Sequence, residues 1–108
     1  MIVILQKKAA KTEIEKAKEE FGDFIKIVID IEKEIAAIGG KLHADAEKLL
    51  LEQGSKNENL WGGGFDLKTG TFDSQAMINI RPLKNDNMEI LDQKIREKFL
   101  EIAEKLLK

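Results

Sequence analysis

The chain has 108 residues and no cysteine, and its 18 basic and 20 acidic side chains leave a formal net charge of −2. This length predicts one domain over residues 1–108. The lack of thiols excludes disulfides, zinc ribbons, iron–sulfur clusters and cysteine nucleophiles, and the lack of a basic block disfavours nucleic acid as a partner.

The N-terminal run MIVILQKK places apolar residues first and lysines after them. A signal peptide needs the reverse order and a longer apolar stretch, and no other segment approaches the length of a membrane span. We therefore expect a cytoplasmic protein with no membrane partner. Within this run, residues 2–5 are rich in β-branched side chains and predict a short buried strand.

The next elements are predicted to be a helix and two strands. Thr12 followed by Glu15 has the capping-box pattern, and apolar residues then recur at helical spacing as far as Phe21. Residues 24–32 have isoleucine at every second position after Phe24, which predicts a strand with one buried and one mixed face. A tight turn leads to a second strand at residues 35–38.

A second helix is predicted over residues 44–53, and residues 55–58 repeat the capping-box pattern, which predicts a single helical turn. The stretch FDLKTGTFD is typical of a hairpin. Residues 76–81, AMINIR, then predict a further strand with its alanine and isoleucines inward and Met77 among the residues on the other face.

The last predicted element is a helix capped by Asp92, with an apolar stripe at helical spacing. The predicted order is therefore β-α-β-β-α-β-β-α. Strands joined by short turns run antiparallel. The expected fold is α+β, with a mainly antiparallel sheet of about five strands and three helices packed on one face.

Three stretches together resemble a known family: HADAEKLLLEQGS, LWGGGF and MINIRP. The chain is similar across nearly its whole length to a family of short prokaryotic proteins, about 100 residues long, that has no assigned function. The resemblance implies a one-domain cytosolic protein from a bacterium or archaeon. It implies no mechanism and no catalytic residue.

His43 is the only histidine, and Asp45 and Glu47 follow it closely. A histidine four residues before a glutamate on a helix places both side chains on one face, as in metal sites. The alternative is an ordinary helix start, because acidic groups favour the positive end of the helix dipole. No second histidine or thiol is present, and no Walker or dinucleotide-binding pattern occurs, so we expect neither a resident metal nor a cofactor.

Trp61 and the glycines Gly62, Gly63 and Gly64 form the most unusual local pattern. Three consecutive glycines lose conformational entropy on folding, which points to a bulge, a close backbone contact or a flap over a ligand. A plain loop before the hairpin is the alternative. Trp61 is interpreted either as an exposed anchor for a partner or as the largest core residue.

Asn79 and Arg81 are predicted to share the open face of a strand, where they and the Trp61–Gly64 stretch are candidate binding residues. An antiparallel sheet with one open face is a natural dimer surface. The preferred hypothesis is a non-catalytic interaction module that forms a homodimer. The alternative is a metal-assisted hydrolase centred on His43, with nearby carboxylates and Arg81 as an anion clamp, and a toxin-like ribonuclease ranks third.

Overall fold

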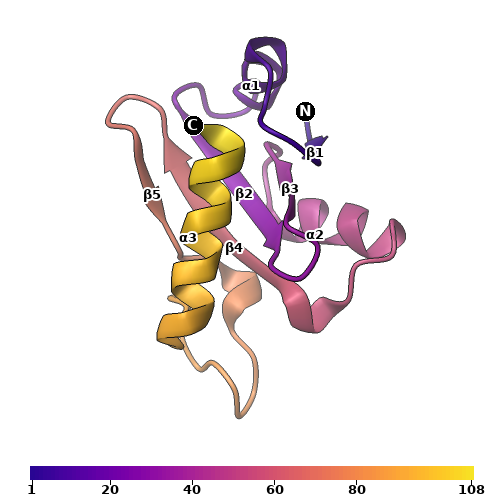
Figure 1. Cartoon of the computed structure of the whole chain (residues 1–108), viewed down its shortest axis with the longest axis vertical. Helices are drawn as coiled ribbons and strands as arrows, with labels where there is room; N and C mark the ends of the chain where they lie inside the picture. Colours follow the sequence, from indigo (N-terminus) through magenta and orange to yellow (C-terminus); the bar gives the residue numbers. More distant parts are fainter.

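The computed structural model describes all 108 residues and confirms an α+β fold with a five-stranded antiparallel sheet (Figure 1). The strand order across the sheet is β1-β3-β2-β4-β5. No helix is both long enough and apolar enough to cross a membrane. The elements in chain order are β1 (Val3–Leu5), α1 (Lys11–Ala17), β2 (Phe24–Asp30), β3 (Ile35–Ile38), α2 (His43–Glu52), the short 3-10 helix η1 (Asn57–Asn59), β4 (Leu60–Asp66), β5 (Thr71–Asp73), the 3-10 helix η2 (Met77–Asn79) and α3 (Gln93–Leu107).

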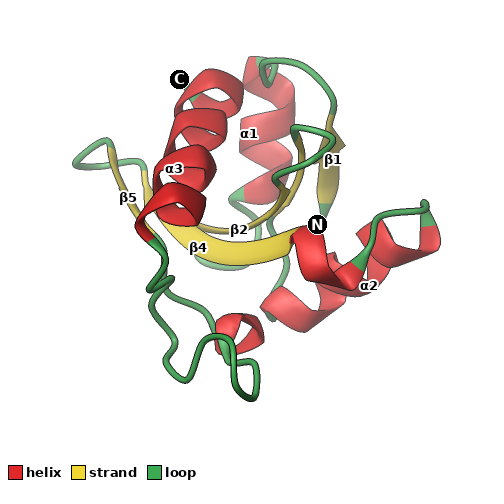
Figure 2. Ribbon diagram, turned by 60° about the horizontal axis from the view of Figure 1, so that its bottom comes forward, coloured by secondary structure: helices red, strands yellow, loops and turns green.

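Helices cover both faces of the sheet, so the expectation that all three pack on one face is wrong (Figure 2). On one face, α1 and α3 pack over the isoleucines of β2. On the other face, Ala46 and Leu50 of α2 pack against Val28. Val28 is as fully buried as the isoleucines beside it. The second half of β2, from Ile27 to Asp30, is therefore buried on both faces, and a helix lies over each.

The three glycines lie inside β4, so the loop alternative is wrong and the close-contact alternative is confirmed. A Cβ on Gly63 would lie 2.7 Å from the ring of Phe99 in α3, and a Cβ on Gly64 would overlap the ring of Phe24. On the face that α2 covers, a Cβ on Gly62 would lie 2.7 Å from the side chain of Ala76. The missing side chains let both layers approach the backbone of a central strand.

Two capping predictions differ from the structure. The N-cap predicted at Thr12 lies two residues earlier, at Ala10, and Glu13 rather than Glu15 accepts a hydrogen bond from the N-cap N–H, at 2.8 Å. The expected helical turn after Ser55 forms as η1, but Ser55 does not cap it. Its hydroxyl instead donates to the buried carboxylate of Asp30 at 2.6 Å. The cap of α1 is therefore still local but shifted along the chain, whereas Ser55 bonds a residue distant in the sequence.

The strand predicted over residues 76–81 is absent. Met77–Asn79 form the 3-10 helix η2, and residues beyond it continue as turns. The apolar residues of this stretch were predicted to face inward, and this is only partly correct, because Ala76 is buried while Ile80 is exposed. The hairpin of β4 and β5 and the long helix α3 are confirmed, and the predicted cap Asp92 accepts from the N–H of Ile95 at 3.0 Å.

Candidate functional site

Residues 74–91, here the asparagine-anchored segment, run along the edge of β4 where β5 no longer pairs with it. β5 pairs with β4 only as far as Gly64. Beyond that point Asn79 takes the place of a strand: its Oδ1 accepts from the N–H of Gly62 at 2.8 Å, and its Nδ2 donates to the carbonyl of Gly62 at 2.9 Å. A side-chain amide has the donor and acceptor of a peptide group, so it satisfies both backbone groups at once.

Asn79 also ties the two ends of the segment together. Its Nδ2 donates to the carbonyl oxygens of Ser74 at 3.1 Å and Met88 at 2.9 Å. The side chain is fully buried. Asn79 was predicted to lie on an open strand face, and that prediction is wrong because its buried amide bonds backbone groups of Gly62, Ser74 and Met88.

Asn85 is a second buried anchor that the sequence analysis missed. Its Oδ1 accepts from the N–H of Leu91 at 2.9 Å, and its Nδ2 donates to the carbonyl oxygens of Asn79, Asn87 and Glu89. The stretch KNDN resembles an ordinary polar loop, and no local signal distinguishes Asn85 from its exposed neighbours. Two buried amides therefore hold a segment that has little regular secondary structure.

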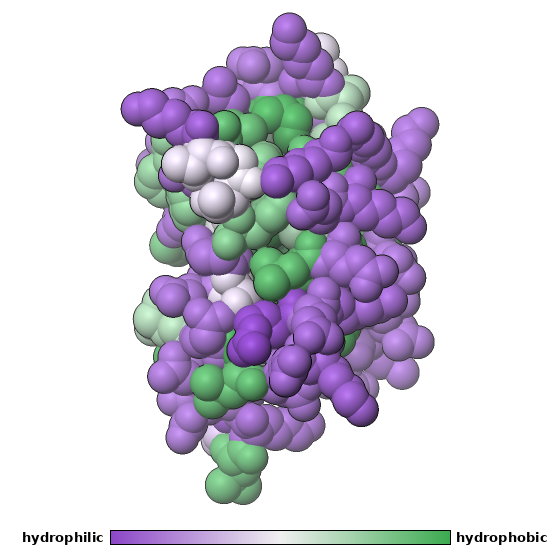
Figure 3. All heavy atoms as spheres, turned by 60° about the vertical axis from the view of Figure 1, so that its left-hand side comes forward, coloured by the Kyte–Doolittle hydropathy of each residue, from purple (hydrophilic) through white to green (hydrophobic).

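The asparagine-anchored segment presents apolar side chains to solvent. It holds five of the nine large apolar side chains that are exposed in the chain. The loop before α3 protrudes from the rest of the molecule (Figure 1), and the surface shows apolar atoms in several spots among hydrophilic ones (Figure 3). Leu83 is fully exposed and has a backbone φ of 67°, a left-handed conformation that is unfavourable for a leucine. The five side chains are those of Met77, Ile80, Leu83, Met88 and Leu91.

Arg81 joins the segment to the strand layer. Its guanidinium lies 3.9 Å from the centre of the Trp61 ring, and its N–H groups donate to the carbonyl oxygens of Glu58 and Leu60. Trp61 belongs to the main core and is almost fully buried, so its interpretation as a core residue is confirmed. Its indole N–H has no partner within the chain. A cation stacked on an aromatic face in this way stabilises the segment.

Beside Arg81 lies a pocket of about 450 Å³ between α2 and the asparagine-anchored segment. Glu47 faces Arg81 there, and Asn57 donates to a Glu47 oxygen at 3.3 Å. Burial raises the pKa of Glu47, which the positive charge of Arg81 partly offsets, and burial lowers the pKa of Arg81. The two side chains were expected near one site, and the structure brings them to one pocket.

His43 begins α2 and lies against β4 instead of opening into that pocket. Its Nε2 is 2.6 Å from the carbonyl oxygen of Gly63. A carbonyl only accepts, so Nε2 carries the hydrogen and Nδ1 keeps the lone pair. Burial lowers the pKa of His43 below 6.5, and the charge of Lys26 lowers it further, against opposing contributions from Gly63 and Asp73. The ring thus acts as a structural hydrogen-bond donor to β4.

The three residues of the predicted His43 site do not converge. Asp45 is exposed in the first turn of α2, the position that the helix dipole favours. Glu47 is directed to the Arg81 pocket. No group of three or more histidine, cysteine, aspartate or glutamate side chains is arranged to hold a metal ion. The helix-start interpretation accounts for Asp45, and the interpretation as a shared site has no geometric support.

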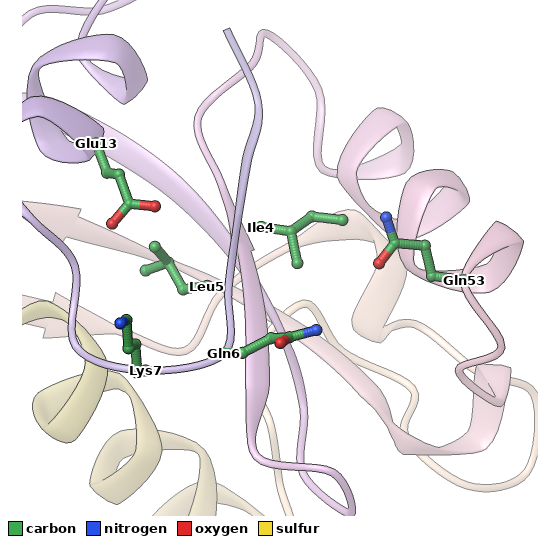
Figure 4. A pocket seen from close by; sticks show the side chains of 6 residues that line it. All are labelled: Ile4, Leu5, Gln6, Lys7, Glu13 and Gln53. Carbon is green, nitrogen blue, oxygen red and sulfur yellow. The ribbon is translucent and has the colours of Figure 1, made fainter.

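A further pocket of about 650 Å³ opens along β1, at an edge of the sheet (Figure 4). Leu5 points toward α1, while Ile4 and Gln53 lie on the side of α2 (Figure 4). None of the predicted site residues lines it. Its lining residues are Ile4, Leu5, Gln6, Lys7, Glu13 and Gln53.

Comparison with known proteins identifies one family. The family model described as Protein of unknown function (DUF5674) matches residues 3–106, which is nearly the whole chain. No curated protein and no solved structure matches the chain. The match accords with the resemblance to a family of short proteins without an assigned function.

Proposed function

The chain belongs to the family Protein of unknown function (DUF5674), and we propose that it is a small cytoplasmic, prokaryotic binding module that acts as a homodimer. The observation that carries this proposal is the asparagine-anchored segment, which displays five apolar side chains on a frame held by buried Asn79 and Asn85. Exposed apolar groups concentrated in one place are typical of interaction sites.

The frame matters as much as the apolar surface. Burying one leucine or methionine side chain fully contributes about 1.5–3 kcal/mol, whereas ordering a flexible loop on binding opposes association. Because Asn79 and Asn85 already fix the segment, dimerisation need not order it. The left-handed φ of Leu83 also indicates a fixed segment. This conformation is unfavourable for leucine, so the rest of the segment must hold it.

A second copy of the chain is the partner that the charges favour. Lys84 and Asp86 are both exposed on either side of buried Asn85, and neither forms an ion pair within the chain. In the proposed dimer the two-fold axis crosses the segment near Asn85, so that Lys84 of one chain faces Asp86 of the other. The segment is therefore self-complementary, with apolar groups and one charge of each sign.

The hydrolase alternative is not supported by a comparable observation. It needs His43, a carboxylate and Arg81 within proton-transfer or one-water contact. In the structure the Nε2 of His43 holds the Gly63 carbonyl, while Glu47 and Arg81 face a separate pocket.

The proposal is tested by sedimentation equilibrium of the wild type, Leu83→Asp and Phe21→Asp, from about 1 μM to about 1 mM protein. Phe21 is a matched control because it is also an exposed apolar side chain, and it lies outside the segment. We expect a wild-type dimer that Leu83→Asp weakens about 100-fold, since each of two copies loses roughly tenfold, and that Phe21→Asp leaves unchanged. A wild-type monomer over the whole range, or equal effects of the two variants, would overturn the proposal.

A further inference from the structure

The pocket beside Arg81 has an unusual distribution of charge. Its walls come from α2, from η1 and from the asparagine-anchored segment, and its eight lining residues include two carboxylates and two cations. The cations are Arg81 and Lys84, and the carboxylates are Glu47 and Glu58. No ion pair within 4.0 Å joins any of these four side chains to another charged group. The pocket therefore offers both signs of charge without direct pairing.

Arg81 and Glu47 have capacity left for a ligand. Two of the five guanidinium N–H groups of Arg81 are occupied by the carbonyl oxygens of Glu58 and Leu60. Glu47 accepts one hydrogen bond, from Asn57 at 3.3 Å. Each of the two charges influences the pKa of the other side chain, yet they stay beyond ion-pair distance. A gap of that kind accommodates a small group with its own positive and negative ends.

We propose that this pocket binds an amino-acid-type zwitterion with an apolar side chain. The ligand carboxylate lies against Arg81 and Lys84, where charge-assisted hydrogen bonds are strongest. The ligand ammonium lies against Glu47, and the ligand side chain packs on Ile78 and Ile80, two apolar residues of the lining. A volume of about 450 Å³ is within the usual range for small-molecule sites and leaves room for an α-amino acid or a dipeptide.

The chain carries its own reporter for this site. Trp61 is the only tryptophan, no tyrosine is present, and the Trp61 ring lies directly beneath the Arg81 guanidinium. A ligand that approaches Arg81 changes the field at the indole, so its binding is measured by Trp61 fluorescence and checked by calorimetry. The probes are L-leucine, L-leucinamide, which lacks the carboxylate, and N-acetyl-L-leucine, which lacks the ammonium.

We expect saturable binding of L-leucine and at least tenfold weaker binding of both analogues, because each leaves one charged side of the pocket without its counterpart. Glu47→Gln should weaken L-leucine at least tenfold while leaving N-acetyl-L-leucine unchanged, and Lys84→Met should weaken L-leucine more than L-leucinamide. Glu52→Gln is the matched control, since Glu52 is an exposed glutamate of the same helix outside the pocket. Arg81 is left intact because it also holds Trp61 and the segment.

One chain supplies every lining residue, but Ile80 and Lys84 also belong to the proposed dimer surface, so ligand binding and dimerisation compete for these two side chains. The titrations are repeated with Leu83→Asp, which weakens the proposed dimer. If a second copy closes the pocket, only this variant binds L-leucine. The proposal is overturned if L-leucine binds neither the wild type nor Leu83→Asp at concentrations up to about 10 mM, a range well beyond ordinary ligand affinities. Equal binding of the three probes, or the same affinity in Glu47→Gln as in Glu52→Gln, overturns it as well.

Discussion

Replacing Asn79 by alanine should destabilise the protein strongly, because its buried amide bonds the N–H and the carbonyl of Gly62 and shares its second N–H between the carbonyl oxygens of Ser74 and Met88. The variant leaves the N–H of Gly62 and the carbonyl oxygens of Gly62, Ser74 and Met88 without this partner, in a fully buried position. A buried donor left unsatisfied costs about 1–3 kcal/mol, and carbonyl oxygens add to it. We therefore expect a loss of about 3–5 kcal/mol from a typical domain stability of about 5–15 kcal/mol.

The assay is urea unfolding followed by Trp61 fluorescence, with the slope of the transition checked against the wild type. Asn57→Ala is the control, because Asn57 is exposed and makes one weak hydrogen bond; its effect should stay within about 0.5 kcal/mol. Asn79→Asp keeps the acceptor for Gly62 but places a carboxylate oxygen against three carbonyls, so its defect should shrink as pH falls and the carboxyl becomes protonated. A loss below about 1 kcal/mol for Asn79→Ala would refute the claim that Asn79 anchors the segment.

Three further predictions concern the sheet. Gly63→Ala should destabilise the protein by about 2 kcal/mol or more, judged by thermal unfolding, since the new Cβ meets the backbone carbonyl oxygen of Asp73 and the ring of Phe99; Gly22→Ala, which meets no neighbouring atom, tests the cost of positive φ alone. The pKa of His43 is lower in the folded state, so the unfolded chain binds the proton more readily. The contribution of His43 to the free energy of unfolding is therefore fully present above pH 6.5 and is lost as the pH falls through the lowered folded-state pKa. His43→Gln should remove this pH dependence, as measured by urea unfolding at several pH values. Asp30→Ala should cost about 2–4 kcal/mol in urea unfolding, as the fully buried Asp30 carboxylate accepts from the Ser55 hydroxyl and from two backbone N–H groups; Asp23→Ala, at an exposed position outside the proposed dimer surface, should change little.

Local patterns predicted most of the secondary structure. The strand β2, the hairpin and the apolar stripe of α3 were confirmed, because each has a local pattern of its own. The expected mixed face of β2 was wrong in part, since Val28 and Asp30 on that face are fully buried. The cap of α3 at Asp92 was also confirmed, since a cap depends only on the next turn of backbone.

The errors occur where a long-range partner outweighed a local preference. Residues 76–81 have strand-like alternation, yet the amide of Asn79 bonds Gly62 and bends the segment away from strand geometry. Ser55 has the pattern of a helix cap but donates to Asp30, which lies 25 residues away in the chain. Such partners leave no trace in a local window of sequence.

The candidate site was predicted in its residues but not in their roles. Trp61, Gly62, Asn79 and Arg81 were selected as binding residues, and the structure does bring them together, with Asn79 bonded to Gly62 and Arg81 stacked on Trp61. These contacts hold the segment in place. Only the tertiary structure showed that the apolar side chains near Leu83 are exposed and that Glu47 and Arg81 line one pocket.

The amino-acid sequence alone was sufficient to establish the α+β fold class, the hairpin, the long C-terminal helix and the exclusion of thiol chemistry, because these depend on composition and short-range periodicity. The tertiary structure was needed to place α2 on the second face of the sheet and to bury Asn79 and Asn85. It was also needed to separate His43 from Arg81, which face Gly63 and Glu47 respectively. These features depend on contacts between residues far apart in the chain, where packing and hydrogen-bond satisfaction outweigh local propensity.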